Sequence, residues 1–65
     1  MKIKVNGDVT ETKAGTVEAL LSELNLRREG VAVEVNLAIV KKKDYAGFAL
    51  KEGDEVEIVN LVGGG

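Results

Sequence analysis

The sequence predicts an α+β fold in which one helix packs on one face of a small mixed β-sheet. Three observations point to it: several short segments alternate apolar and polar residues, one segment has helical spacing, and the chain has only 65 residues. A chain of this length holds one domain. Twenty residues are Val, Leu or Ile, so the chain can form an aliphatic core and disorder is not expected.

The first element is a β-hairpin. Lys2 to Val5 alternates Lys with Ile and Val, as in a half-buried strand. Asn6-Gly7 follows, the dipeptide that best tolerates the positive φ angles of a type I′ turn, and Val9 to Thr12 is expected to be the returning strand.

A single amphipathic helix comes next, over about Val17 to Leu24. Thr16 is placed to cap its N-terminus, and Glu18 in its first turn suits the helix dipole. Asn25 is expected to end the helix, with Leu26 turned back onto the core. The apolar positions recur at i, i+3, i+4 and i+7, namely Val17, Leu20, Leu21 and Leu24.

The rest of the chain is expected to be strands joined by turns. Val31 to Val35 alternates as a third strand, and Ile39-Val40 forms a short fourth one after a turn near Asn36-Leu37. Tyr45 to Leu50 is expected to cover one end of the core as an irregular segment or one helical turn. The last strand spans Val56 to Val62, after a turn at Gly53-Asp54 and a charged loop at Lys41 to Asp44.

This order of elements predicts the β-grasp, or ubiquitin-like, arrangement, because one helix on one sheet face buries both its own stripe and the inward strand residues. The first and last strands are expected to lie side by side and parallel, joined by a long right-handed crossover. We expect a β-grasp domain over residues 1–62 and a flexible glycine tail over residues 63–65.

The composition excludes several kinds of chemistry. The chain has no Cys and no His, so a thiol nucleophile, an imidazole base and a zinc site built from those ligands are excluded. The net charge of −2 and a pI near 5.0 argue against nucleic-acid binding. No apolar run approaches the roughly 18 residues of a membrane span, and residues 1–5 do not resemble a signal peptide. We expect a cytoplasmic protein with no membrane partner and no bound cofactor, one that is not an enzyme.

The C-terminus is the most informative segment, because the last predicted strand runs directly into Gly63-Gly64-Gly65. Residues without Cβ adopt any backbone conformation and fit a narrow channel, and three of them extend roughly 10 Å. The tail is therefore suited to placing the Gly65 carboxylate in the active site of another protein.

The whole chain resembles the ThiS family of sulfur-carrier proteins. The most specific part of the match is the ending Gly64-Gly65. Two positions depart from the family pattern: Leu37, where Gly is common after Asn, and Lys42, where Pro is common. The matching segments are Ile3 to Gly7, Gly15 to Val17 with Leu20-Leu21, Val31 to Asn36, Gly53-Asp54 and Val62 to Gly65.

The resemblance implies a protein substrate for other enzymes. A ThiF-like E1 adenylating enzyme, which uses ATP and magnesium, activates the Gly65 carboxylate, with Gly64 beside it in the channel. A persulfide, commonly made by a cysteine desulfurase, supplies sulfur. The resulting Gly65 thiocarboxylate is used by a ThiG-like thiazole synthase in thiamine biosynthesis.

The residues that contact a partner are expected to lie at the end of the last strand. If Val56, Ile58 and Asn60 face the helix, then Glu57, Val59 and Leu61 face outward, and exposed aliphatic residues often mark partner sites. A covering loop or a bulge would remove this patch. The expected partner-binding residues are Val59, Leu61, Val62, Gly63, Gly64 and Gly65.

Charged segments are weaker indications of a partner-binding surface. Glu52, Asp54, Glu55 and Glu57 form an acidic cluster that could steer a basic partner, although solubility explains it equally well. Lys41 to Lys43 is read as a solvated loop.

Other functions are compatible with the same residues. Within the class, the chain could carry sulfur for molybdopterin synthesis, as MoaD does, or for cysteine or methionine synthesis. Outside it, a ubiquitin-like modifier would transfer the same glycine to a lysine amine, and a non-covalent β-grasp binding module of the RNA-associated TGS type would need no glycine tail.

Overall fold

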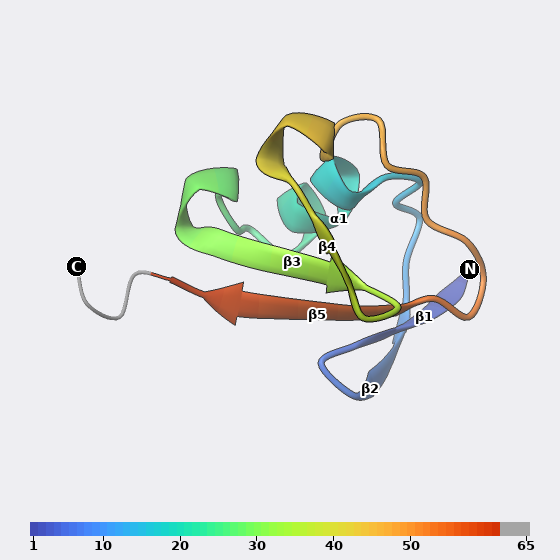
Figure 1. Ribbon diagram of the computed structural model, residues 1–65. Coiled ribbons are helices and arrows are strands. Elements are labelled where there is room, and N and C mark those ends of the chain that lie inside the picture. Colours follow the sequence, from blue (N-terminus) through green and yellow to red (C-terminus); the bar gives the residue numbers. More distant parts are fainter. Residues whose placement is uncertain (62–65) are drawn as a thin grey trace.

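The computed structural model describes residues 1–61, so the predictions for Val62 and the three terminal glycines lie outside the described residues. These described residues form five strands and one α-helix (Figure 1). Their bounds are β1 (Lys2–Val5), β2 (Asp8–Glu11), α1 (Val17–Glu23), β3 (Val31–Val35), β4 (Ala38–Val40) and β5 (Glu55–Asn60), with 3₁₀ turns at Arg28–Gly30 and Lys42–Asp44.

The five strands form one mixed sheet in the order β2-β1-β5-β3-β4. β1 and β5 are parallel neighbours, whereas β1 with β2, β3 with β4 and β3 with β5 are antiparallel. The parallel pair confirms the predicted crossover, and the whole arrangement confirms the β-grasp fold.

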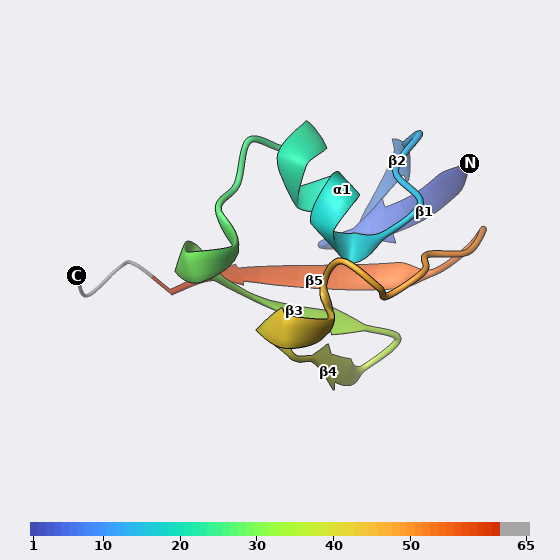
Figure 2. The same ribbon diagram turned by 90° about the horizontal axis from the view of Figure 1, so that it is seen from above.

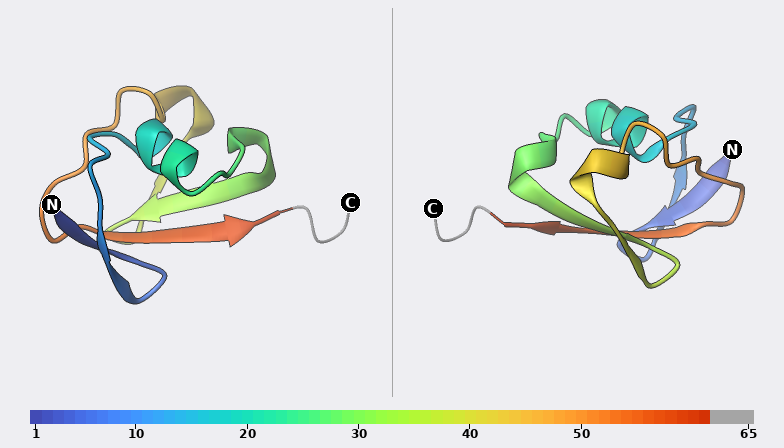
Figure 3. Two further views of the ribbon diagram at one scale, coloured as in Figure 1. Left: turned by 180° about the vertical axis from the view of Figure 1, so that it is seen from behind. Right: turned by 45° about the horizontal axis from the view of Figure 1, so that its top comes forward.

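The helix lies across one face of this sheet, as the view from above shows (Figure 2). Both 3₁₀ turns lie on the same side as α1, and the other side of the sheet carries no helix from the described part of the chain (Figure 3). Within residues 1–61, no helix is long and apolar enough to cross a membrane.

Both ends of α1 follow the sequence prediction. The Thr16 hydroxyl accepts a hydrogen bond from the Ala19 N–H at 3.1 Å, which caps the N-terminus. Asn25 adopts a left-handed φ of 59°, and the Leu26 N–H returns to the Leu21 carbonyl at 2.9 Å. This is the Schellman ending, and it turns the partly buried Leu26 onto the core.

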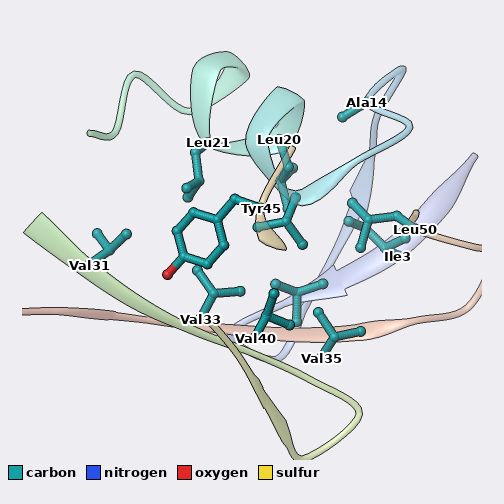
Figure 4. Close-up of a cluster of buried hydrophobic side chains, with 12 residues drawn as sticks. Ile3, Ala14, Leu20, Leu21, Val31, Val33, Val35, Val40, Tyr45 and Leu50 are labelled. Carbon is teal, nitrogen blue, oxygen red and sulfur yellow. The ribbon is translucent and has the colours of Figure 1, made fainter. Parts of the chain in front are cut away.

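The core between α1 and the sheet is almost entirely aliphatic. Tyr45 is its one buried aromatic residue among those described, 1% exposed, with its ring between Leu21 of α1 and Val33 of β3 (Figure 4). Complete burial of a Leu or Val side chain contributes roughly 1.5–3 kcal/mol. The other buried apolar residues are Ile3, Ala14, Val17, Leu20, Val31, Val35, Val40, Leu50 and Val56.

The segment from Tyr45 to Leu50 also completes the helix. Its carbonyls at Phe48 and Tyr45 accept the N–H groups of Val17 and Glu18 at 3.1 and 3.0 Å. These two donors have no partner within the helix itself. The predicted covering segment is thus confirmed, and it has the additional role of satisfying the first turn of α1.

Element boundaries differ from the prediction by one or two residues. β2 begins at Asp8 and ends at Glu11, α1 ends at Glu23, and β5 spans Glu55–Asn60. Leu24 forms the C-cap and is 37% exposed, so its expected place in the buried stripe is wrong. The chain leaves helical geometry there before the side chain can turn inward.

Candidate functional site

The candidate site lies at the end of β5, where the last described residues leave the sheet. β5 is the central strand, held between β1 and β3. The Leu61 N–H donates to the Gly30 carbonyl at 2.8 Å, so the backbone is still fixed one residue beyond the strand. The four predicted site residues that follow, Val62, Gly63, Gly64 and Gly65, lie outside the described residues. The structure therefore defines the base from which they extend.

The alternation predicted for β5 is confirmed. Val56 is 1% exposed and Ile58 packs against the core, whereas Val59 and Leu61 are 56% and 53% exposed. Within residues 1–61, no loop covers either residue and no bulge interrupts the register of β5 with β3. Asn60 has the parity of Val56 and Ile58 but is exposed, because it lies beyond the end of the core.

Ile39 belongs to the same face and was missed by sequence reasoning. Glu34 alternates with the buried Val33 and Val35, so it points away from α1, and Ile39 of β4 lies directly opposite it. Ile39 is 75% exposed. Only the strand order could show that it shares this face with Val59, two strands away across β3. We call Ile39, Val59 and Leu61 the outer apolar patch.

A shallow hollow lies on the other side of the strand end. It is lined mainly by the connection between α1 and β3, including Leu26, Arg27 and Val31, together with Asn60. The end of β5 is thus accessible from both faces of the sheet.

The acidic residues near β5 do not form the single cluster that the sequence indicated. Asp54 is only 5% exposed, and its carboxylate accepts the Asn36 side-chain amide at 3.0 Å and the Lys51 N–H at 2.8 Å. Glu52 accepts the Lys2 N–H at 3.0 Å. Asp54 is therefore not part of an exposed acidic surface, whereas Glu52 is exposed, and steering of a basic partner stays a prediction. Glu55 and Glu57 remain on the outer face.

The described residues offer binding surface and no evident catalytic apparatus. In residues 1–61, no three acidic side chains come together as metal ligands would. The site holds the end of an extended strand in a fixed direction beside an apolar patch. This suits a domain that presents its C-terminal segment to another protein.

A β-grasp domain whose exposed last strand leads into a Gly-Gly sequence belongs to the ubiquitin-like class of proteins. The model of the ThiS family matches residues 3–65, which is nearly the whole chain. The chain belongs to the ThiS family.

Individual relatives agree with this assignment. The chain is 50% identical over 66 residues to a thiazole synthase of Paramagnetospirillum magneticum, with 100% of this chain and 20% of that protein aligned. It is 32% identical to the sulfur carrier protein ThiS of Escherichia coli, with both chains fully covered. The chain thus spans about a fifth of the length of the thiazole synthases it matches and the whole length of that carrier.

A solved structure supports the fold independently. The crystal structure of the thiamine biosynthesis protein ThiS from Geobacter metallireducens superimposes with a TM-score of 0.85. It is 32% identical in sequence, and all of both chains is covered.

Proposed function

We propose that this protein is a sulfur carrier of thiamine biosynthesis whose Gly65 carboxylate is adenylated and then converted to a thiocarboxylate. The observation that carries the proposal is the family match, which extends through residue 65 and so includes the Gly-Gly ending. The structure adds a fixed and exposed base for that ending, because Leu61 is held by Gly30 and is itself part of the outer apolar patch.

The proposed chemistry begins with activation of a poor electrophile. The Gly65 carboxylate attacks the α-phosphate of ATP on a ThiF-like adenylating enzyme, which also binds magnesium, and pyrophosphate leaves. The terminal sulfur of a persulfide, made by a cysteine desulfurase, then attacks the acyl carbon and displaces AMP. A thiol of the partner cleaves the new S–S bond, leaving a thiocarboxylate on Gly65 and a disulfide on the partner.

The carrier itself contributes the acyl group and its position. Val59, Leu61 and Ile39 provide exposed aliphatic surface for a partner at the base of the tail. Gly63 and Gly64 enter the partner's channel, because residues without a side chain fit a narrow passage, and Val62 contacts the partner at the entrance of the channel. A ThiG-like thiazole synthase is the proposed sulfur acceptor, in keeping with the thiazole synthases that contain a similar segment.

The first test is chemical. The protein is incubated with the adenylating enzyme, ATP and a persulfide donor, and its intact mass is measured. We expect the mass change of one oxygen replaced by sulfur, located on Gly65. Since the thiazole synthase relatives are longer, the mass of the protein from its natural source should first establish that Gly65 carries a free carboxylate.

Deleting Gly65 retracts the reacting carbon by roughly 3.5 Å. Displacements of about 1 Å can cost about 10²-fold in rate, so we expect thiocarboxylate formation to fall at least that far. Gly64→Val should act similarly, because a β-branched side chain would obstruct the channel.

Gly47→Val is the matched control. A Cβ at Gly47 meets no atom within 4 Å, and the segment from Tyr45 to Leu50 lies at the opposite end of the domain from the end of β5 (Figure 1). Its reaction rate should stay at the level of the unmodified protein. If the Gly65 deletion still forms a thiocarboxylate, or the intact protein never does, the carrier function is wrong.

A further inference from the structure

The sheet face opposite α1 carries a row of residues across three strands, in which Ile39 and Glu57 are exposed and Glu34 is half-buried. Across β4, β3 and β5 this row consists of Ile39, Glu34 and Glu57, each opposite the next in the strand register. The neighbouring row consists of Ala32 and the exposed Val59, also opposite each other. Two carboxylates are thus set directly beside the outer apolar patch.

Two acidic residues of β5 face outward in different surroundings. Glu55 lies opposite Lys4 of β1, a residue of opposite charge. Glu57, two residues further along the same strand and face, lies opposite Glu34 of β3. Within residues 1–61, ion pairs form at Met1 with Glu11 and at Arg28 with Glu18, and neither involves this pair.

Like charges directly opposite each other destabilise an antiparallel pair of strands. The free domain therefore gains nothing from Glu34 facing Glu57. A cation placed over both carboxylates would relieve the repulsion, and the aliphatic side chains of Ile39 and Val59 would exclude water around the contact, which strengthens it.

We propose that the protein that binds the glycine tail docks on this face through an apolar surface with a basic side chain, an arginine, placed over Glu34 and Glu57. The planar guanidinium has five N–H donors and can bond two adjacent carboxylates at once, which the compact lysine ammonium does less well. The proposal rests on the proposed function, since it assigns this surface to the adenylating enzyme.

The position of this face next to the end of β5 supports the adenylating enzyme as its partner. Leu61 is the last residue of the patch and also the base of the tail, and the four residues beyond it span at most about 14 Å. An enzyme that receives the Gly65 carboxylate must therefore come within that distance of Leu61. On the outer face it meets the exposed aliphatic side chains of Val59 and Leu61 there. Complementary charge at such a contact determines which partner binds and how fast.

The test compares variants as substrates of the adenylating enzyme, with the rate of AMP transfer followed at several carrier and NaCl concentrations. For the double variant Glu34→Gln, Glu57→Gln we expect the KM for the carrier to rise about tenfold, with kcat unchanged and a weaker dependence on salt. Glu55→Gln is the matched control, with the same chemical change on the same strand and face. Its KM should stay within about twofold of the unmodified protein.

A second variant separates docking from folding. Glu57→Lys should raise the melting temperature, because it places a cation opposite Glu34, and it should raise the KM further than the double variant. Opposite effects on stability and binding are not expected of a residue with a merely structural role. A lower melting temperature would contradict the unfavourable pairing from which the inference starts.

The two proposals fail in different ways. If the unmodified protein is adenylated but the double variant has the same KM and salt dependence, the arginine contact is wrong and the carrier function stands. If the unmodified protein is never adenylated, the carrier function fails, and this docking surface fails with it.

Discussion

The two β-hairpins of this protein have the same kind of turn built from different residues. In the first, Asn6 and Gly7 have φ angles of 51° and 88°. In the second, Asn36 and Leu37 have φ angles of 52° and 72°. Both are two-residue turns with two left-handed positions, as a type I′ hairpin requires, yet only the first has glycine at its second position.

In both turns the asparagine also contacts β5. The Asn6 N–H and side chain bond the backbone of Val56 and Ile58, at distances of 2.8 to 3.2 Å. The Asn36 N–H and side chain bond the Glu55 backbone at 2.7 and 3.0 Å, and its amide also donates to Asp54. Each hairpin is therefore fixed to the central strand.

The comparison shows why the second turn can form without glycine. A left-handed conformation costs a residue with a Cβ about 1–2 kcal/mol. Leu37 is 88% exposed, so burial of its side chain does not offset that cost. The bonds of Asn36 to Glu55 and to the buried Asp54 hold the turn instead. Tertiary contacts thus override the local preference at one residue.

The largest effect is expected from removing the second asparagine. Asn36→Ala leaves one oxygen of the buried Asp54 carboxylate without its amide donor and puts alanine in a left-handed conformation, so we expect a loss of about 2–4 kcal/mol. Asn6→Ala puts alanine in the same left-handed conformation, but its side-chain partners are exposed backbone groups, so it should cost less, about 1–3 kcal/mol. Urea unfolding of both variants measures the difference, and equal losses would show that the Asp54 contact adds nothing.

A smaller loss is expected from making the first turn like the second. Gly7→Leu keeps the asparagine but puts a Cβ at φ 88°, and no atom lies within 4 Å of that Cβ. The whole effect should be backbone strain of about 1–2 kcal/mol. The shift of the urea midpoint measures this loss, provided that the m-value is unchanged. A loss above 3 kcal/mol would indicate that the register of β1 and β2 had shifted.

The smallest expected effect is a gain in the free energy of unfolding, whereas the other variants lose stability. Leu37→Gly relieves the left-handed strain, partly offset by the greater freedom of glycine in the unfolded chain, so we expect a gain of about 0.5–1 kcal/mol. Thermal unfolding, with the Gly7→Leu variant as the reciprocal control, measures it. A destabilised Leu37→Gly variant would mean that the exposed Leu37 side chain stabilises the folded protein despite its exposure.

Much of the fold could be predicted from local patterns. The Asn-Gly turn, the Thr16 cap, the left-handed Asn25 and the alternation in β3 and β5 all appear where the sequence placed them, because each depends on residues close together in the chain. The parallel pairing of β1 with β5 also follows, since few arrangements bury one helix on so small a sheet.

The candidate site was predicted less completely. Val59 and Leu61 were found from alternation within one strand, whereas Ile39 and the pairing of Glu34 with Glu57 depend on register between strands. Asp54 was wrongly placed in the exposed acidic cluster because nearness in sequence does not distinguish it, buried and hydrogen-bonded, from the exposed Glu57.

The sequence by itself determined the order of the elements, which face of each strand is buried, and the glycine ending on which the proposed function depends. These properties follow from side-chain periodicity and from the backbone freedom of single residues. Tertiary structure alone decided that Phe48 and Tyr45 cap the first turn of α1, that Leu37 adopts a left-handed conformation, and that two glutamates face each other on the outer side of the sheet. The physical reason is that these features are set by hydrogen bonds and strand register between residues far apart in the chain, which no local pattern records.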